Sequence, residues 1–398
     1  MRCIRKIQED LYWVGAEDRK ARLFENIFPI PRGMAYNSYL LIDEKIVLLD
    51  TVDQTVSKQF LENIEYMLKN KTIDYLIINH MEPDHAAVIQ ELSAKYPNMK
   101  IIGNIQIQKL LKQFFTFDVE SKMQIVKENE ILNTGKHQLK FIFAPMVHWP
   151  EVMVTYDEYS KTLFSADAFG SFGTLNGNLF NTDINIEKEF INEARRYYAN
   201  IVGKYGMQVQ SLLRKLNGTE IQTLCPLHGQ VWKENINYII NKYDKWSKYE
   251  PEEKSVIIVY STIYGHTENA VNILANYLGE NGIKNIKVYD VSQIDVSYLV
   301  AESFRSSHIV IATAMYNMSV FPKMQEYIEE ISRLNLKNRT VSLIVNSSWA
   351  PEHSNKIKEK LEKMTVLEEK LIIKSAIKEE NMEQIKKVGD SIIKQIMV

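Results

Sequence analysis

Cysteine is nearly absent from this sequence. Only Cys3 and Cys225 occur among 398 residues, which is too few for a disulfide framework. The two are not spaced as a C-x-x-C pair for zinc, rubredoxin-type iron or dithiol chemistry. Any metal that the protein binds must therefore be held mainly by histidine, aspartate and glutamate side chains.

Long apolar runs and an excess of charge are also missing. No stretch approaches the roughly 18 uninterrupted apolar residues of a membrane-spanning helix, and the first residues lack the apolar core of a secretory signal. The 48 Lys and Arg residues nearly balance the 50 Asp and Glu residues, so the formal net charge is -2. Because the charge indicates neither a nucleic acid nor a membrane as partner, we expect a cytoplasmic protein.

The length of the chain predicts more than one domain, since domains contain roughly 100 to 200 residues. Residues 245–254 are charged, include a proline and lack an apolar face, so they are the best candidate for a linker. We place the boundary near Glu250, which divides the chain into residues 1–250 and 251–398.

The two parts have different apolar patterns. The first part combines a predicted hairpin over residues 36–50 and further short strands with helical segments, of which the longest covers residues 186–216. The second part alternates amphipathic helices with five apolar runs, at residues 256–260, 286–289, 309–312, 341–345 and 371–373. Continuous apolar strands between helices indicate a doubly wound parallel sheet that is covered on both faces.

The strongest motif is His80-Met81-Glu82-Pro83-Asp84-His85, which follows a predicted strand at residues 75–78. It places four potential metal ligands within six residues, although a polar loop with a capping aspartate and surface histidines could have the same composition. His148, Asp167 and His228 also follow predicted strands. Because a sheet delivers its strand ends to one edge, we expect these distant residues to converge on a two-metal site.

These residues and their spacings resemble the flavodiiron variant of the metallo-β-lactamase fold. The matching segments are H-x-E-x-D-H followed by His148, Asp167 and His228, together with residues 36–39, 148–150 and 195–200. The resemblance covers nearly the whole chain and implies an α/β architecture. It would consist of a metallo-β-lactamase-like αββα sandwich followed by a flavodoxin-like, doubly wound parallel sheet of five strands.

Glu82 distinguishes the motif from that of zinc hydrolases with this fold, which usually have histidine at this position. The full set contains four histidines and three carboxylates, and its hard oxygen ligands favour a redox-active metal such as iron over tetrahedral zinc. The resemblance implies one iron held by His80, Glu82 and His148, a second held by Asp84, His85 and His228, and Asp167 as the bridge. His137 has no role in the family, and we expect it at the surface.

A hydroxyl-rich loop joins the first strand and first helix of the second part, with the residues Thr262, Ile263, Tyr264, Gly265, His266 and Thr267. Its backbone N–H groups and the positive end of the helix dipole suit a phosphate, and a simple helix cap is the alternative. The segment resembles the phosphate loop of flavodoxin, whose sheet binds FMN where the strand order reverses.

The resemblance therefore implies FMN as cofactor. Two further loops would surround its ring, with the residues Thr313, Ala314, Met315, Tyr316 and Asn317 in one and Ser347, Ser348 and Trp349 in the other. The second loop departs from the Gly-Ser-Tyr-Gly-Trp pattern of the family by replacing both glycines. Trp349 could equally be a partly buried packing residue.

The resemblance also implies an oxidoreductase. Two irons and FMN together store four electrons, the number that reduces O2 to two waters. We therefore expect O2 reduction for oxygen detoxification, with coupling of two NO to N2O as the alternative. The expected electron donor is a separate protein such as rubredoxin, and the expected assembly is a head-to-tail homodimer or dimer of dimers. Glu82 argues against a zinc-dependent hydrolase of the same fold, and the complete ligand set argues against an electron-transfer module with a vestigial metal site.

Overall fold

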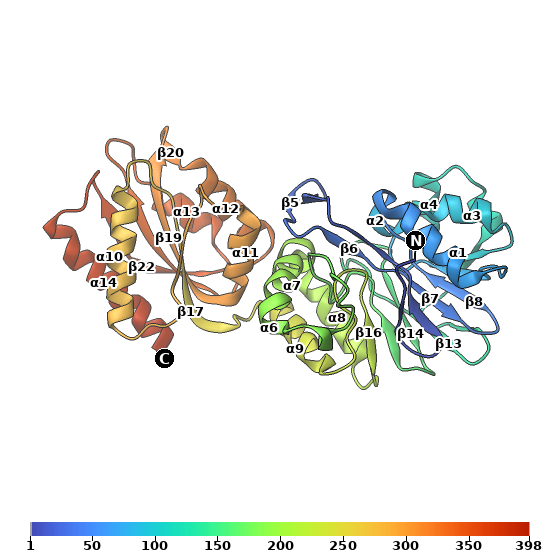
Figure 1. The fold of residues 1–398 in the computed structure, drawn as a ribbon. Coiled ribbons are helices and arrows are strands. Elements are labelled where there is room, and N and C mark those ends of the chain that lie inside the picture. Colours follow the sequence, from blue (N-terminus) through green and yellow to red (C-terminus); the bar gives the residue numbers. More distant parts are fainter. Residues whose placement is uncertain (1, 398) are drawn as a thin grey trace. The chain divides into compact units, whose positions relative to one another are not determined.

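The computed structural model describes residues 2–397, which form two compact units (Figure 1). The first unit runs from the N-terminal part of the chain to Tyr198 and continues over Met207–Asp244. The second contains Ala199–Gly206 and the chain from Lys245 onward. Each unit has its own sheets and its own hydrophobic core.

Two sheets form the centre of the first unit. Inner strands such as β8 and β14 are completely buried, because both faces of each sheet are covered. The larger sheet has the order β1 (Arg5–Lys6), β2 (Leu11–Trp13), β7 (Tyr39–Ile42), β8 (Ile46–Leu49), β9 (Tyr75–Ile77), β10 (Lys100–Gly103), β11 (Met123–Ile125). The smaller has the order β12 (Ile131–Asn133), β13 (Gln138–Phe143), β14 (Met153–Asp157), β15 (Thr162–Phe164), β16 (Thr223–Cys225). Two short pairs join β3 (Ala16–Asp18) to β6 (Met34–Tyr36) and β4 (Leu23–Phe24) to β5 (Phe28–Pro29).

Helices cover the outer faces of the two sheets (Figure 1). Beside the larger sheet lie α1 (Ser57–Leu68), α3 (Ile89–Lys95) and α4 (Ile105–Phe114), with the short helices α2 (Pro83–Ala86) and α5 (Val119–Lys122) nearby. Beside the smaller sheet lie α6 (Ile186–Glu189), α7 (Ile191–Tyr197), α8 (Gly206–Leu216) and α9 (Ile236–Ser247). This helix–sheet–sheet–helix order confirms the predicted αββα sandwich.

The predicted single helix over residues 186–216 is wrong, because the chain is broken there into shorter pieces. After α7 come a π-helical turn at Tyr198–Val202 and a 3-10 turn at Gly203–Tyr205, before α8 begins. A side chain on Gly206 would collide with the carbonyl oxygen of Ser247. Close backbone packing, which helical periodicity does not reveal, therefore shapes this segment.

Residues 245–254, the candidate linker, make buried contacts within the second unit. Trp246 is fully buried and Tyr249 is 4% exposed. The Trp246 indole donates a hydrogen bond to Glu252 (2.8 Å), and the carbonyl oxygen of Tyr249 accepts one from the buried Arg339 guanidinium (2.6 Å). The charged residues that flank these two aromatic side chains conceal the anchoring in the sequence.

Five parallel strands form the sheet of the second unit, in the order β18 (Lys287–Asp290), β17 (Glu253–Tyr260), β19 (Ser306–Tyr316), β21 (Thr340–Asn346), β22 (Thr365–Ile373). Numbered along the chain, this is the order 2-1-3-4-5 of flavodoxin-like sheets. The short strand β20 (Ser319–Val320) pairs antiparallel with β19. The predicted doubly wound parallel sheet of five strands is confirmed.

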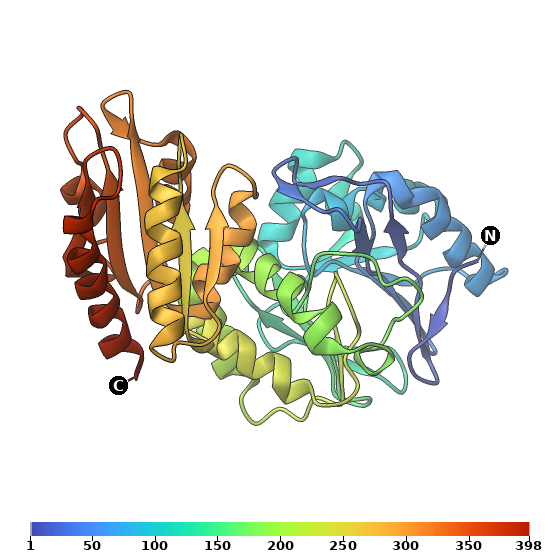
Figure 2. The ribbon, with the colours of Figure 1, turned by 60° about the vertical axis from the view of Figure 1, so that its left-hand side comes forward.

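Helices cover both faces of this parallel sheet. On one face α10 (His266–Glu280) and α14 (Glu379–Met397) lie side by side, and they enclose an apolar core with the strands (Figure 2). On the other face α11 (Val296–Arg305) packs against α12 (Pro322–Arg333), and α13 (Ser354–Lys360) packs against α12. The loops that follow β17, β19 and β21 therefore meet at one edge of the sheet.

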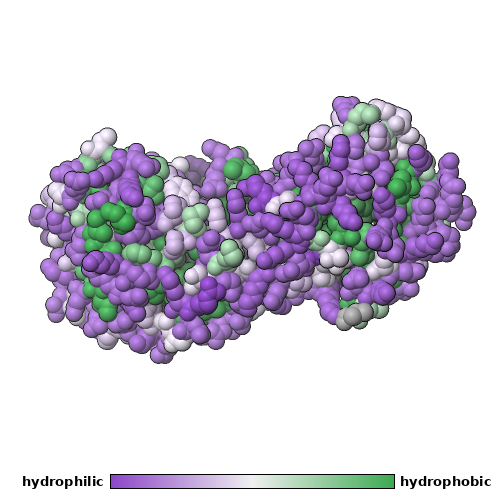
Figure 3. Space-filling model, turned by 180° about the vertical axis from the view of Figure 1, so that it is seen from behind, coloured by the Kyte–Doolittle hydropathy of each residue, from purple (hydrophilic) through white to green (hydrophobic). Residues whose placement is uncertain are grey.

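None of the helices within residues 2–397 is both long and apolar enough to cross a membrane. The face in Figure 3 is mainly hydrophilic, with hydrophobic residues in small separate groups. Of the large apolar side chains in the described part of the chain, Tyr264, Met207 and Trp349 are the most exposed. Two of these three belong to the predicted flavin loops.

His137 is buried, which corrects the prediction of a surface residue. Its Nδ1 lies 2.6 Å from Oδ2 of Asp157, and its Nε2 lies 3.4 Å from Oδ2 of Asp10. Burial opposes a charged ring, but the hydrogen bonds and charges of Asp157, Asp10 and Asp43 outweigh it and raise the pKa of His137. Burial likewise opposes the charge of Asp157, yet the same pairing lowers the pKa of that carboxyl.

We predict that His137→Gln lowers the free energy of unfolding by about 3 kcal/mol near pH 6, since it leaves a buried carboxylate without its partner. Because folding raises the pKa of His137, the contribution of this residue to stability is complete below its unfolded pKa of 6.5. The contribution is lost as the pH rises through the folded pKa. Because folding lowers the pKa of Asp157, the stabilisation by its ionised carboxyl is present above the unfolded pKa of 3.8 and is lost as the pH falls below that value. Urea denaturation followed by tryptophan fluorescence measures the loss.

The partner variant provides the control for this pair. Asp157→Asn should cost a similar amount, and the double variant should lose little more than either single variant. If His137→Gln costs as much at about pH 9 as near pH 6, the stabilisation does not come from a charged pair.

Candidate functional site

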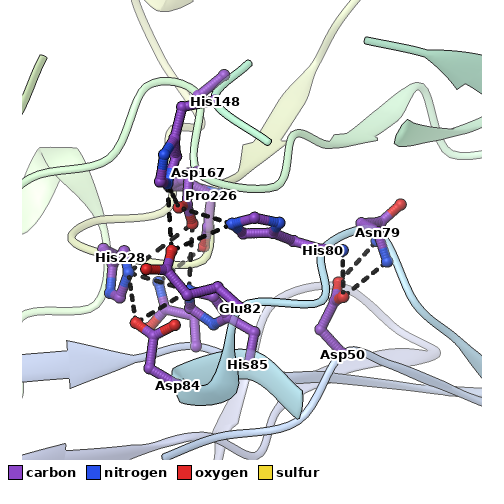
Figure 4. A network of polar contacts seen from close by, with 12 residues as sticks. Asp50, Asn79, His80, Glu82, Asp84, His85, His148, Asp167, Pro226 and His228 are labelled. Carbon is purple, nitrogen blue, oxygen red and sulfur yellow. Dashed lines mark hydrogen bonds and ion pairs between the residues drawn. The ribbon is translucent and has the colours of Figure 1, made fainter. Parts of the chain in front are cut away.

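The seven predicted metal ligands come together beyond the strand ends of the first unit, and all are buried (Figure 4). Their ligand atoms form two groups, and within each group these atoms lie within 4.8 Å of one another. The first group comprises His80 after β9, Glu82, His148 from the loop between β13 and β14, and Asp167 after β15; the second comprises Asp84 and His85 on α2 and His228 after β16.

Asp167 lies between the two groups. Its Oδ2 is 3.2 Å from Nε2 of His148 and 3.4 Å from Nε2 of His80. Its Oδ1 is 3.1 Å from Nε2 of His85 and 3.8 Å from Nε2 of His228. Each oxygen of this one carboxylate thus faces a different group, which is the geometry of a bridging ligand.

Several buried carboxylate oxygens of the two groups make no hydrogen bond. These are both oxygens of Asp84 in the second group and Oδ1 of Asp167 in the first, although Oδ1 of Asp167 lies 3.1 Å from Nε2 of His85. Nε2 of His85 and Nε2 of His228 face each other at 3.0 Å, although at most one of two neutral rings can donate there. Buried polar atoms are normally paired, so this arrangement of oxygen and nitrogen donors fits bound cations better than hydrogen bonding alone.

The predicted flavin loops line a pocket of about 300 Å³ at the edge of the parallel sheet. All of the predicted residues line it except Gly265 and Thr313. Thr313 is buried beneath the pocket, where its hydroxyl lies 3.1 Å from that of Ser261. Asn346, which precedes Ser347 at the end of β21, also lines the pocket, and two lining residues were missed by the sequence motifs, namely Ala350 and Ser375. Asn346 donates to the carbonyl oxygen of Ser375 (3.0 Å), which brings the loop after β22 to the pocket.

The first loop of the pocket has the form that suits a phosphate. Gly265 has a φ of 88°, a conformation that favours glycine, and its N–H donates to the Thr262 hydroxyl (3.0 Å). The fifteen-residue helix α10 begins at the next residue, so the positive end of its dipole faces the pocket. Trp349 is 77% exposed, which excludes the packing alternative and leaves its ring free for a ligand.

Known proteins resemble this chain over most of its length. Residues 34–229 match the family described as ODP family beta lactamase. An uncharacterized protein of Methanocaldococcus jannaschii is 31% identical over 388 residues, which cover 96% of each chain. An anaerobic nitric oxide reductase flavorubredoxin of Escherichia coli is 31% identical over 349 residues, which cover 86% of this chain and 72% of that protein.

Solved structures share the fold of both units. The rubredoxin oxygen:oxidoreductase of Desulfovibrio gigas is 26% identical, with a TM-score of 0.93 over 99% of each chain. The flavodiiron protein of Giardia intestinalis is 25% identical, with a TM-score of 0.93 over 100% of this chain and 97% of that one. The chain belongs to the flavodiiron protein family. It is therefore an oxidoreductase, and the resemblance drawn from its motifs is confirmed.

In this member of the flavodiiron family, further residues hold the ligand side chains in place. Asp50 accepts hydrogen bonds from the backbone N–H groups of Asn79 and His80 (2.7 and 3.2 Å) and so fixes the start of the motif (Figure 4). Oε1 of Glu151 lies 2.7 Å from Nδ1 of His80. Nδ1 of His228 lies 2.8 Å from the carbonyl oxygen of Ala35. Such outer contacts orient histidine ligands, and they were missed because a ligand motif does not contain them.

The charges of the seven side chains do not balance one another. Burial opposes an ionised Asp167, yet the charges of His80 and His85 hold the pKa of that carboxyl well below its usual range. Burial raises the pKa of Asp84 to about 8, since repulsion from Glu82 and Asp167 adds to it and His85 only partly offsets it. A cation bound beside Asp84 would supply the missing positive charge. The site therefore fits metal ions, which would displace protons on binding.

Aromatic rings enclose the site. Phe24, Tyr36 and Tyr197 surround His228, with ring centres 5.5, 5.8 and 5.5 Å from its own. Trp149 packs edge-on against His80 at 5.5 Å. The buried hydroxyl of Tyr197 has no hydrogen-bond partner. These walls restrict access of water to the ligands and make Tyr197 a candidate for a substrate contact.

Glu25 is a site residue that the sequence did not indicate. It lies at the turn between β4 and β5, where the residue is exposed to solvent and has a positive φ of 50°. Burial of its carboxyl and the adjacent Glu82 carboxylate raise the pKa of Glu25 to about 8. Since Glu25 belongs to no motif and precedes Glu82 by 57 positions, only the folded chain shows that the two are neighbours.

We predict that Asp167→Ala lowers the metal content from two ions per chain to one or none and abolishes turnover, because both groups lose a ligand. The flavin absorption spectrum should not change, since no residue that lines the flavin pocket is altered. Metal analysis and visible spectroscopy of the purified variant provide the test. Glu120→Ala, which removes an exposed carboxylate, should keep both ions. Loss of flavin from Asp167→Ala would contradict two separate sites.

Proposed function

We propose that this protein reduces O2 to water at a di-iron centre that receives electrons through FMN, and that its role is oxygen detoxification. The position of Asp167 carries the proposal, because its two oxygens face two different ligand groups. His80, Glu82 and His148 would hold one iron, Asp84, His85 and His228 the other, and Asp167 would bridge them. Three carboxylates among seven ligands favour iron over tetrahedral zinc.

FMN would occupy the pocket of the second unit, with its phosphate at the loop of Thr262 and Gly265 and its ring beside Tyr316 and Trp349. We assign residues 1–250 to the di-iron domain and residues 251–398 to the FMN domain. When bound, the two irons and FMN together supply the four electrons that reduce one O2 to two waters.

The side chains of the protein would position the substrate, shield the site from bulk water and deliver protons. Asp167 and the aromatic rings of Phe24, Tyr36 and Tyr197 confine a small apolar molecule between the ligand groups and limit the access of bulk water. Glu25, an exposed carboxyl beside Glu82, is a candidate proton donor, since water formation consumes protons. No nucleophilic side chain takes part.

The donor and assembly follow from the same family assignment. We propose that a separate protein such as rubredoxin reduces the FMN, which is supported by the rubredoxin oxygen:oxidoreductase among the similar structures. We also propose a homodimer or a dimer of dimers. Neither a nucleic acid nor a membrane has a place in this function.

Reduction of NO to N2O at the same centre is the second candidate. It is favoured by the Escherichia coli relative that is named an anaerobic nitric oxide reductase and is 31% identical to this chain. Coupling of two NO would use the same ligand groups, with one molecule at each, and would consume two electrons and two protons to give one N2O and one water.

Separate turnover with O2 and NO tests the assignment. The holoprotein, reduced anaerobically through rubredoxin, should consume O2 at least about tenfold faster than NO and release water without hydrogen peroxide. Oxygen and NO electrodes measure the two initial rates on the same preparation. A faster reaction with NO would establish NO reduction instead, and a protein that contains zinc and reduces neither gas would contradict both candidates.

A further inference from the structure

The histidines of the two ligand groups have different partners at their outer nitrogens. Nε2 of His80 faces Glu82 and Asp167, and its Nδ1 contacts the carboxylate of Glu151 at 2.7 Å. Nδ1 of His228 contacts a neutral backbone carbonyl, and Nδ1 of His85 is buried without any hydrogen-bond partner. Of these three histidines, only His80 in the first group therefore has a carboxylate hydrogen-bonded to its Nδ1.

Glu151 is fixed rigidly in this position. Its side chain is fully buried, and Oε1 also accepts a hydrogen bond from the backbone N–H of Met81 (2.8 Å). Its backbone carbonyl accepts a hydrogen bond from the Asn104 side chain (2.7 Å), and the Asn104 side chain also caps α4. The loop that provides His148 therefore also provides, three residues later, the charge behind His80.

We propose that Glu151 is a positioning residue that makes the two iron positions unequal in redox potential. The inference rests on the proposed function, because it concerns a centre with two irons. A carboxylate behind an imidazole raises its basicity as a ligand. An added negative charge in a buried site stabilises a ferric ion more than a ferrous one. An iron held by His80, Glu82 and His148 would therefore have a lower reduction potential than an iron held by Asp84, His85 and His228.

With irons and two-electron reduced FMN bound, this inequality would set the order of electron entry. The first electron would be held at the position of Asp84, His85 and His228, and the second at the position of His80, Glu82 and His148. The charge of Glu151 would thus stabilise the centre after one electron has entered.

The variant Glu151→Gln tests the inference, because it removes the charge and keeps an oxygen that can accept both hydrogen bonds. In an anaerobic redox titration of the holoprotein, followed by electron paramagnetic resonance, the wild type should show two separate one-electron steps. The equilibrium constant for forming the one-electron reduced centre from the oxidised and fully reduced centres should fall by about tenfold in Glu151→Gln. This change corresponds to a decrease of about 59 mV in the difference between the two potentials. The lower of the two potentials should move upward, and the higher should stay in place.

A matched control exists in the same unit. Asp157→Asn removes another buried carboxylate from a histidine Nδ1, but that histidine, His137, is not in either ligand group. It should leave both potentials unchanged. Glu151→Asp keeps the charge, so it should retain both irons and restore most of the separation between the steps.

The possible results separate this inference from the proposed function. A wild-type centre with two iron steps that Glu151→Gln does not alter overturns the inference and leaves the function intact. A wild type that metal analysis shows to contain no iron overturns the function itself. If Glu151→Gln loses iron, the variant Glu151→Asp decides between the two explanations. Retention of iron in Glu151→Asp, with the wild-type difference between the two potentials, supports the role of the charge. Loss of iron or a smaller difference in Glu151→Asp as well shows that Glu151 acts through packing and contradicts the inference.

Discussion

The carboxylate of Asp167, buried between two sets of ligands, is the constraint on which the rest of the site depends. Three carboxylates and four histidines share a buried space, where burial and the neighbouring carboxylates raise the pKa of Asp84 to about 8. Two cations would compensate this excess of negative charge, and Asp167, with one oxygen toward each ligand group, would lie between them. The elements of the sandwich hold these side chains close together, because each ligand follows a strand or lies at the short helix α2.

The second unit forms its pocket from loops at one edge of its parallel sheet. Its strand order brings the loops after β17, β19 and β21 to one edge, where backbone N–H groups, hydroxyls and exposed aromatic rings can surround a flat anionic cofactor. Tyr264 and Trp349 stay exposed although burial would be favourable for an aromatic side chain. Such exposure is consistent with rings that await a stacking partner.

Local patterns in the sequence predicted the parts of the structure that depend on local chemistry. The motif from His80 to His85, the strand-end positions of His148, Asp167 and His228, and the five apolar strands of the second part all reappear in the fold. Contacts between distant segments were not predictable. The break in the helix after Tyr197 depends on the approach of Ser247 to Gly206, and burial of His137 depends on Asp10 and Asp157. Glu151 and Glu25 acquire their roles only when the chain brings them to His80 and Glu82.

Anomalous diffraction at the iron absorption edge, from crystals of the loaded protein, tests the central claim most directly. The account predicts two iron peaks about 3.5–4 Å apart, with one oxygen of Asp167 directed at each. One peak should lie among His80, Glu82 and His148, and the other among Asp84, His85 and His228. A single peak, a signal only at the zinc edge, or iron bound away from Asp167 would contradict the account.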